Sequence, residues 1–406
     1  MNAWRKSMPN RVTISICLAV CLIYGLVFFR RPVIVGGFRP PLFAAAPGVL
    51  SGENDQPFFS EELLPTDPSF KTAHVASICE LSDGALLAVW YAGPREFDRD
   101  VAVYRSVRAP GKSAWSEPQV LVDRIGASRE LKRSVRKVGN PLIWSDGGNR
   151  VYLLYVSAIG GWASSSINLK TSEDGGKTWG PSVRLTLSPF CNLSELVRNQ
   201  PLALEGGGFM VPIYHETIGK FPEILWLLPD SGGRGGFVVW KTRIDRSRGF
   251  LQPSVVRLDS HSAIAFLRNS RGKQLGLSTS SNAGLSWEAP GYAGLPNPNS
   301  GICAIRISGG RLLIVFNDES RPGARDNLRL AVSDLQGKNW TRIAGLEDAA
   351  YQTFAYPFII QTHDGLYHVV YSYNGNRIKH LTLNEAWIED RIRDAGQPGP
   401  WPNNRE

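Results

Sequence analysis

Residues 172–179, SEDGGKTW, decide the fold of this chain. The octapeptide suits a tight turn between two β-strands. Asp174 can accept hydrogen bonds from nearby backbone N–H groups, Gly176 can adopt a positive φ, and Trp179 can cover the turn with apolar surface. The order Ser-x-Asp-x-Gly-x-Thr-Trp therefore predicts a hairpin turn here, with a strand on each side.

Three further segments repeat this pattern. Residues 280–287 (SSNAGLSW) keep the Ser, the Gly and the Trp and carry Asn282 in place of the Asp. Residues 333–340 (SDLQGKNW) keep the same three residues, and residues 106–115 (SVRAPGKSAW) form a longer and looser version. One octapeptide could arise by chance in a loop, but four related segments indicate a repeated structural unit.

A second repeat gives the number of units. Short turns of Gly, Asp or Ser recur along the chain, and each is followed by a run of apolar residues. The turns lie near residues 84, 148, 207, 261, 310 and 365, and they precede ALLAVWY, VYLLYV, FMVPIY, AIAFL, LLIVF and LYHVVYSY. Runs rich in β-branched and aromatic residues are typical of buried strands. Six units of roughly fifty residues predict an all-β, six-bladed β-propeller, and a large β-sandwich is the alternative.

The N-terminal region is different in kind. Val12–Phe29 is a run of eighteen uncharged, mostly apolar residues, just long enough to span the hydrocarbon core of a membrane. Basic residues on both sides favour a cytoplasmic N-terminus only weakly. A cleaved signal peptide is the alternative, but the nearest small-residue site, Ala44–Ala46, lies well past the apolar run. We therefore expect one N-terminal transmembrane helix in the cytoplasmic membrane of a bacterium, with the propeller on the extracytoplasmic (periplasmic) side.

These features divide the chain into four parts. Residues 1–31 form the membrane anchor, 32–68 a Pro-rich tether, 69–387 the six-bladed propeller and 388–406 a polar tail. The anchor holds five Lys or Arg and no acidic residue, so 40 of the 45 basic residues lie in the other parts, against 36 acidic residues. Such a mild excess is no electrostatic footprint for nucleic acid, so none is expected as a partner.

Cofactor chemistry is not indicated either. The cysteines beyond the anchor, Cys79, Cys191 and Cys303, are dispersed and odd in number, so at most one disulfide is possible and buried thiols are expected. The sequence has no Cys/His metal constellation and no P-loop. We therefore expect neither a metal nor another cofactor.

With six units and these turn octapeptides, residues 70–386 resemble the sialidase (neuraminidase) superfamily. The chain looks closest to bacterial sialidase-like proteins with bacterial neuraminidase repeats, in which the octapeptide turn is called an Asp-box. The resemblance implies a glycosidase site at the centre of the propeller. There, three Arg hold the carboxylate of the sugar, a Tyr is the nucleophile, a Glu is its base and an Asp is the acid. Guanidinium groups suit this task because they bind a carboxylate bidentately.

Some of these positions carry over to this chain. Tyr356, in Phe-Ala-Tyr-Pro, resembles the nucleophile, since the family has an Ala-Tyr-Ser segment there. Arg268 ends the fourth apolar run, where the family has its second Arg, and Arg325 precedes the fifth Asp-box-like segment as the third Arg does. Glu96 lies on the first-unit loop that holds the acid, and Asp98 is close enough to compete for that role.

Two positions depart from the family. His74 stands where the first Arg is expected, and it carries charge only near or below about pH 6.5 unless its neighbours raise its pKa. Gln252 stands where the Glu base is expected, and an amide cannot take a proton from Tyr356. Glu216 and Glu319 are possible substitute bases. The resemblance therefore implies the architecture more firmly than ordinary action on sialic acid.

Further polar residues are predicted to rim the central pocket. Asn140 lies in a Gly-Asn-Pro segment that follows Arg136, and Arg198-Asn199-Gln-Pro repeats this arrangement one unit later. A simple Asn-Pro turn is the alternative explanation. The residues predicted to bind substrate are His74, Arg268, Arg325, Gln252, Arg136, Asn140, Arg198, Asn199 and Arg377. Three Trp outside the octapeptides could stack on sugar faces: Trp162, Trp226 and Trp240.

Three classes of function stay open at this point. The first is an exo-acting glycosidase on an acidic glycan, or a polysaccharide lyase on uronic-acid glycans at the same site. The second is a catalytically silent propeller that binds glycans, which His74 and Gln252 favour. The third is a scaffold whose blades bind protein. The surviving Arg pair, Tyr356 and the carboxylates of the Glu96 loop favour the first.

Overall fold

The computed structural model describes residues 14–22, 38–45, 48, 56–96, 98–187, 194–217, 219–230 and 236–395. The chain divides into two compact units, Met1–Arg39 and Pro40–Glu406. In the first unit residues 14–22 are helical, and no helix among the described residues is long and apolar enough to cross a membrane. The rest of Val12–Phe29 lies outside the described residues. The expected transmembrane helix is therefore not found, and the location of the protein stays a prediction.

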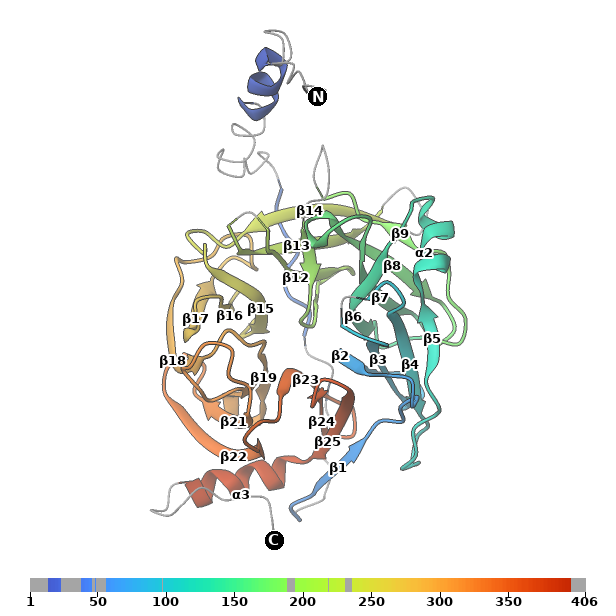
Figure 1. Ribbon diagram of the computed structural model, residues 1–406. Coiled ribbons are helices and arrows are strands. Elements are labelled where there is room, and N and C mark those ends of the chain that lie inside the picture. The colour runs from blue at the N-terminus through green and yellow to red at the C-terminus, as the bar shows by residue number, and fades with distance from the viewer. Residues whose placement is uncertain are drawn as a thin grey trace, which may run out of the picture. The chain divides into compact units, whose positions relative to one another are not determined.

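Strands of the second unit form six antiparallel sheets among the described residues, set around a common axis (Figure 1). The first blade contains β2 (Thr72–Glu80), β3 (Leu86–Gly93), β4 (Ala102–Arg108) and β5 (Gln119–Val122). The second contains β6 (Lys137–Ser145), β7 (Val151–Ala158), β8 (Ser165–Ser172) and β9 (Val183–Arg184). The third contains β10 (Glu195–Val197), β11 (Leu202–Ala203), β12 (Phe209–His215), β13 (Phe221–Pro229) and β14 (Phe237–Arg243).

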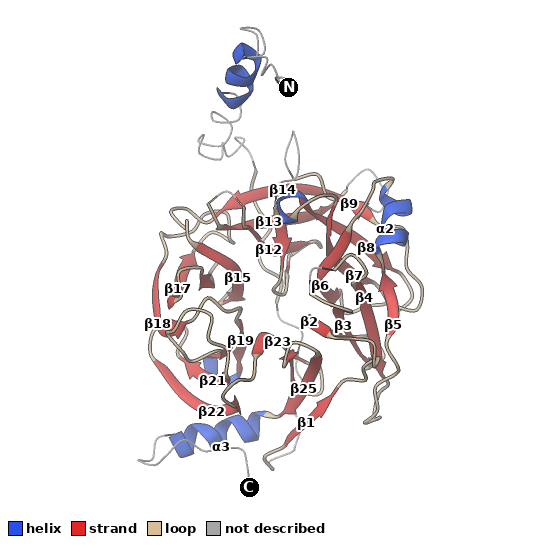
Figure 2. Cartoon of the chain, viewed as in Figure 1, coloured by secondary structure: helices blue, strands red, loops and turns tan. Residues whose placement is uncertain are grey.

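The remaining blades follow in the same order around the axis. They are β15 (Phe250–Arg257), β16 (Ala263–Asn269), β17 (Lys273–Ser280) and β18 (Gly291–Asn297); β19 (Cys303–Ile307), β20 (Arg311–Phe316), β21 (Asn327–Ser333) and β22 (Trp340–Asp348); and β23 (Phe354–Gln361), β24 (Tyr367–Tyr373) and β25 (Arg377–Leu383) with β1 (Phe59–Leu63). Helices α2 (Arg124–Leu131) and α3 (Glu385–Ala395) lie at the periphery (Figure 2).

The six apolar runs in the sequence are the second strands of the six blades, β3, β7, β12, β16, β20 and β24. These strands are almost entirely buried, because neighbouring blades cover both of their faces. The predicted turns near residues 84, 148, 207, 261, 310 and 365 each precede one of them. The six-bladed propeller is therefore confirmed, and the β-sandwich alternative is wrong.

The octapeptide turns join the third and fourth strands of their blades. Asp174 accepts from the backbone N and the hydroxyl of Thr178, at 2.8 and 2.6 Å, and these bonds lower its pKa to about 2. Gly176 has a φ of 81°, and a Cβ there would meet Leu87 of the neighbouring blade at 2.9 Å. The indole of Trp179 donates to the carbonyl of Gly176 at 3.0 Å. The turn at residues 280–287 repeats this pattern with Asn282 as acceptor.

The last blade is closed by the N-terminal strand. Strand β1 pairs with β25, and Glu62 lies opposite His380. Sequence analysis placed residues 59–63 in the tether, but this pairing makes them part of the propeller. Phe43 is also fully buried, and its backbone N donates to the carbonyl of Ser260 at 3.0 Å. The tail was predicted from residue 388, but α3 extends to Ala395 and packs on the propeller through the buried side chain of Ile388.

A cluster of polar groups holds β1 in place. The Oε1 atom of Glu62 accepts hydrogen bonds from Arg108 at 3.1 Å and from the Trp115 indole and Nδ1 of His380 at 2.9 Å each. Since Nδ1 of His380 donates to Glu62, its Nε2 accepts from Nδ1 of His368, 3.0 Å away. This cluster therefore joins the first and last blades through a carboxylate and two neutral imidazoles. Its members are Glu62, Arg108, Trp115, His368 and His380.

The buried histidines make stability depend on pH. Burial lowers the pKa of His368 and of His380 below the ordinary value of 6.5, and it lowers the pKa of His215 to about 4. The folded protein then binds fewer protons than the unfolded chain below pH 6.5, so stability is complete above that pH and is lost as the pH falls through the lowered values. The free energy of unfolding falls by about 1.4 kcal/mol per pH unit for each histidine that is protonated in the unfolded chain but stays neutral in the folded protein.

Thermal unfolding between pH 8 and pH 5 tests this expectation. The midpoint should be nearly constant down to about pH 6.5 and should then fall. His368→Gln should reduce the slope, whereas His363→Gln, at an exposed position, should leave it unchanged. A midpoint that stays constant to pH 5 would contradict the prediction.

Candidate active site

The innermost strands of four blades carry a bulge at the same place. Pairing is interrupted in β2, β6, β15 and β23. At each interruption a non-glycine residue has a positive φ: Val75 (54°), Asn140 (44°), Gln252 (46°) and Tyr356 (56°). A bulge bends its strand and re-aims a side chain, and such backbone strain gathers at functional sites. All four residues line one pocket near the axis.

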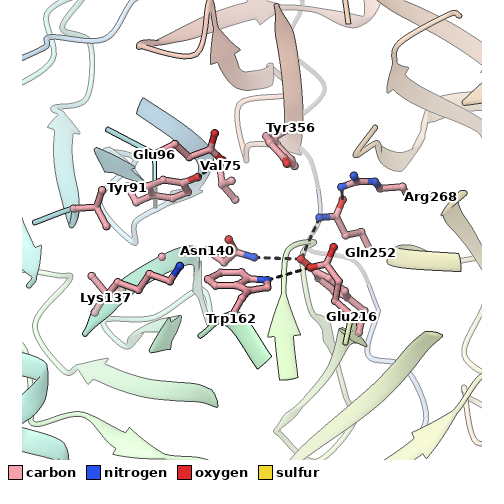
Figure 3. A pocket seen from close by; sticks show the side chains of 14 residues that line it. Val75, Tyr91, Glu96, Lys137, Asn140, Trp162, Glu216, Gln252, Arg268 and Tyr356 are labelled. Carbon is pink, nitrogen blue, oxygen red and sulfur yellow. Dashed lines mark hydrogen bonds between the residues drawn. The ribbon is translucent and has the colours of Figure 1, made fainter. Parts of the chain in front are cut away.

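This pocket has a volume of about 220 Å³. Side chains from five blades line it, and Figure 3 shows how they converge. Its walls are formed by Val75, Tyr91, Glu96, Val101, Lys137, Val138, Gly139, Asn140, Trp162, Tyr214, Glu216, Gln252, Arg268 and Tyr356. Of the predicted site residues, the structure therefore brings Tyr356, Glu96, Gln252, Asn140 and Arg268 together here.

Tyr356 lies against two guanidinium groups. The Arg325 side chain hydrogen-bonds Tyr356, and its Cζ lies 5.2 Å from the centre of the ring. Burial alone would raise the pKa of Tyr356, but the charges of Arg268 and Arg325 outweigh burial and hold it below its usual value of 10. Gly301 lets the ring approach, because a Cβ there would lie 3.2 Å from Tyr356 Cδ1. The pKa of Tyr356 is therefore lower than that of an ordinary phenol.

A hydrogen-bond chain fixes the amides of the pocket. Arg268 Nη1 donates to Gln252 Oε1 at 3.0 Å, and Gln252 Nε2 donates to the hydroxyl of Tyr214 at 3.1 Å. Asn140 Nδ2 donates to the same hydroxyl at 3.2 Å. Arg268 Nε donates to Asn299 Oδ1 at 2.8 Å, so both side-chain acceptors of Arg268 found in the described structure are neutral amide oxygens. Its charge is therefore available to an anion.

Two carboxylates face the pocket from different blades (Figure 3). Glu96 accepts from the Tyr91 hydroxyl at 3.4 Å. Glu216 accepts from the Trp162 indole at 3.2 Å, and the ammonium of Lys137 lies 4.9 Å above the same indole ring. Of the two substitute bases considered from the sequence, Glu216 therefore lines the pocket. Glu319 instead pairs with Arg321 at 2.9 Å and does not line it.

His74 lies beside the pocket in a neutral state. Its ring is 6.1 Å from that of Tyr356, and its Nε2 is 3.9 Å from Glu96. Burial lowers the pKa of His74; Glu96 raises it only in part, and Arg325 lowers it further. His74 therefore carries no charge at neutral pH, so the positive charge that the resemblance implies at this position is absent.

Several predicted residues lie elsewhere. Asp98 pairs with Arg95 at 3.8 Å and accepts from the backbone of Asp100, and it does not line the pocket. Arg136 and Arg377 are exposed outside the lining. Arg198 and Asn199 were expected at the rim, but both lie in the interior, 1% and 0% exposed.

Asn199 has a supporting role there. Its Nδ2 donates to the backbone carbonyls of Gln252 at 3.1 Å and Pro253 at 3.0 Å. These two hydrogen bonds fix the backbone at the bulge of β15. Among the three Trp considered from the sequence, Trp162 lines the pocket, Trp226 is fully buried in its blade and Trp240 lies on β14.

Sequence reasoning missed Tyr91, Tyr214 and Lys137. A signal was available for two of them. Tyr91, Tyr214 and Arg268 are each the sixth residue of the second strand of their blades, β3, β12 and β16. Arg268 was predicted because it ends its apolar run. The same position in the runs of β3 and β12 predicts Tyr91 and Tyr214.

Comparison with known proteins agrees with this architecture. A family model described as BNR repeat-like domain matches residues 84–369. A search of curated proteins returns no match. Similar solved structures include a Hadza microbial sialidase, Hz136 (TM-score 0.63, 13% identity over 77% of this chain and 66% of that chain), and the intramolecular trans-sialidase from Ruminococcus gnavus (TM-score 0.62, 12% identity, 79% and 96%). A leech intramolecular trans-sialidase is similar too (TM-score 0.63, 11% identity, 80% and 69%).

At these identities the likeness shows the fold alone, and the chain spans slightly less than two thirds of the Hadza sialidase. The fold and the central pocket define a sialidase-like β-propeller. Because the family model matches more than half of the chain, the protein belongs to the BNR repeat-like domain family.

Proposed function

We propose that this protein is an exo-acting glycosidase whose pocket binds a terminal sugar bearing a carboxylate. The observation that carries the proposal is Tyr356, a partly exposed phenol with a lowered pKa, beside the charges of Arg268 and Arg325. A pocket of about 220 Å³ suits a single sugar ring better than a long chain. The Ruminococcus gnavus protein was solved with oseltamivir carboxylate, which is an acidic ligand.

The proposed reaction uses groups of this chain only. Arg268 and Arg325 bind the carboxylate, and their charges favour the phenolate of Tyr356 in a site where Gln252 stands in place of the Glu base. The phenolate oxygen bonds to the anomeric carbon while the bond to the leaving oxygen breaks, and Glu96 gives its proton to that oxygen. Water then releases the sugar from Tyr356 and returns a proton to Glu96.

Removing one guanidinium should separate acidic from neutral ligands. Arg268→Ala should weaken binding of acidic sugars by roughly tenfold or more, because a charge-assisted contact contributes about 1.5–3 kcal/mol. Neutral sugars should bind nearly as before. Calorimetry with matched acidic and neutral monosaccharides measures both, and Arg136→Ala, at an exposed position outside the pocket, is the control. Equal losses for the two ligand classes would refute the carboxylate role.

A panel of sialosides and uronic-acid glycosides tests the activity itself. A released sugar with a saturated ring supports the glycosidase. An unsaturated, ultraviolet-absorbing product would instead mean a lyase that uses the phenolate of Tyr356 as a base. Binding of acidic members without turnover would mean a silent glycan-binding propeller, in keeping with Gln252 and the neutral His74.

A further inference from the structure

Arg198 is a buried cation that lies outside the pocket lining, near the ring of Tyr356. It follows β10 and is 1% exposed. Its Nη2 donates to the carbonyl of Pro357 at 2.8 Å, whereas Nε and Nη1 have no hydrogen-bond partner in the described structure. Burying a charge without its partners costs several kcal/mol, and every such group in a folded protein calls for an explanation.

The surroundings of Arg198 supply no carboxylate that acts strongly on it. Burial lowers its pKa to about 10, so it is still charged at neutral pH. After burial, the groups with the largest effect on this pKa are the Cys303 thiol, the phenols of Tyr356 and Tyr214, and the charge of Arg268. Burial raises the pKa values of Cys303 and Tyr214, so neither group offers a negative charge. Tyr356 is then the group best able to become the counter-charge.

The geometry favours this pairing. The Cζ of Arg198 lies 5.8 Å from the centres of the Tyr356 and Phe358 rings. A cation near an aromatic ring is attracted by its negative π face. Ionisation spreads negative charge from the hydroxyl into the ring of a phenol, so a cation at the ring stabilises the phenolate more than the neutral form. Arg198 can therefore act on Tyr356 through the ring.

Of the other groups around Tyr356, Arg268, Glu96, Tyr91 and Tyr214 line the pocket, and Arg325 and His74 lie outside its lining. Arg268 and Arg325 favour its ionised form, and Glu96 opposes it. Uncharged neighbours are His74, Tyr91 and Tyr214. An acidic ligand in the pocket would neutralise Arg268 and Arg325 and so weaken their effect on Tyr356. Arg268 lines the pocket and Arg325 is half-buried, whereas Arg198 is 1% exposed, so such a ligand would leave the charge of Arg198 uncompensated.

We propose that Arg198 is a positioning residue that stabilises the ionised form of Tyr356 from outside the pocket, and that it keeps doing so when an acidic ligand occupies Arg268 and Arg325. The second half rests on the proposed function. The first half concerns the protein alone and can be measured without substrate.

Spectrophotometric titration of Tyr356 in the full chain tests the proposal. The phenolate absorbance of Tyr356 is the difference between each protein and the same protein carrying Tyr356→Phe. Arg198→Gln keeps a donor for the Pro357 carbonyl but removes the charge, and Arg198→Lys keeps both. Arg198→Gln should raise the pKa of Tyr356 by about one unit, a tenfold loss of phenolate at neutral pH, and Arg198→Lys should raise it by less.

A purely structural Arg198 predicts a different result. Arg198→Gln and Arg198→Lys would then titrate alike, with the pKa of Tyr356 unchanged from the parent, and that outcome would overturn the proposal. Thermal unfolding shows that each variant is folded, and Arg198→Met replaces Arg198→Gln if the latter is not. A shifted titration with no turnover in the glycoside panel would reject the proposed glycosidase and leave the role of Arg198 standing.

Discussion

Tyr356→Phe should lower turnover of an acidic glycoside by about 10⁴-fold or more, because removal of a nucleophile has effects of that order or larger. The substitution removes one oxygen atom and keeps the ring, which packs against Val75, Tyr91 and Val101. Ligand affinity should therefore change little, since Arg268 and Arg325 remain. A large fall in kcat with a nearly constant dissociation constant is the expected signature.

A matched control separates this effect from a general cost of losing a phenol. Tyr292, on β18, is 57% exposed and lies outside the pocket, so Tyr292→Phe should keep the parent rate. Rates are measured under single-turnover conditions and affinities by calorimetry. If Tyr356→Phe retains most of the parent rate, Tyr356 is not the reactive group and the proposed mechanism is wrong.

Removing the closing strand should have the largest effect on stability. A chain that begins at Thr66 lacks β1 and Leu64, whereas one that begins at Pro57 keeps them. The shorter chain loses the buried Leu64 and leaves Arg108, Trp115 and His380 without the Glu62 carboxylate. We expect its free energy of unfolding to be lower by about 4 kcal/mol or more, a large part of the total for a typical domain.

Urea unfolding of the two fragments measures this difference, because both lack Phe43 and differ only in the strand and its flanking residues.

Two point variants in the full chain locate the effect within β1. Glu62→Gln should cost about 1.5–3 kcal/mol, since Glu62 accepts three hydrogen bonds. Glu61→Gln, whose carboxylate is half exposed and pairs with Lys379, should cost less than about 1 kcal/mol. Equal stability of the fragments would mean that β1 is not needed for closure.

The blades could be predicted because each is encoded locally, by a turn and an apolar run that follow one another. Strand β1 could not, since FSEEL has two acidic residues and its partner β25 lies more than three hundred positions away. The same holds for α3, of which only Trp387 and Ile388 are buried. Such elements are fixed by long-range packing, which no local pattern reveals.

The lining of the pocket was predicted where a motif names the residue, as for Tyr356, Arg268 and Glu96. It was not predicted where the backbone decides which way a side chain points. Asn140 and Arg198 occur in similar Asn-Pro contexts, yet Asn140 has a positive φ and reaches the pocket while Arg198 is buried beneath it. The lowered pKa of His74 likewise depends on burial, which its neighbours in the sequence do not disclose.

At the bulge in each of the innermost strands β2, β6, β15 and β23, one residue with a positive φ lines the central pocket, and its blade supplies the backbone that holds it. A substitution at such a position changes one side chain of the pocket and leaves the hydrogen bonds between the strands of its blade intact. The residue at the bulge of β15, Gln252, can therefore be replaced while the propeller stays folded. New chemistry can arise there by single substitutions.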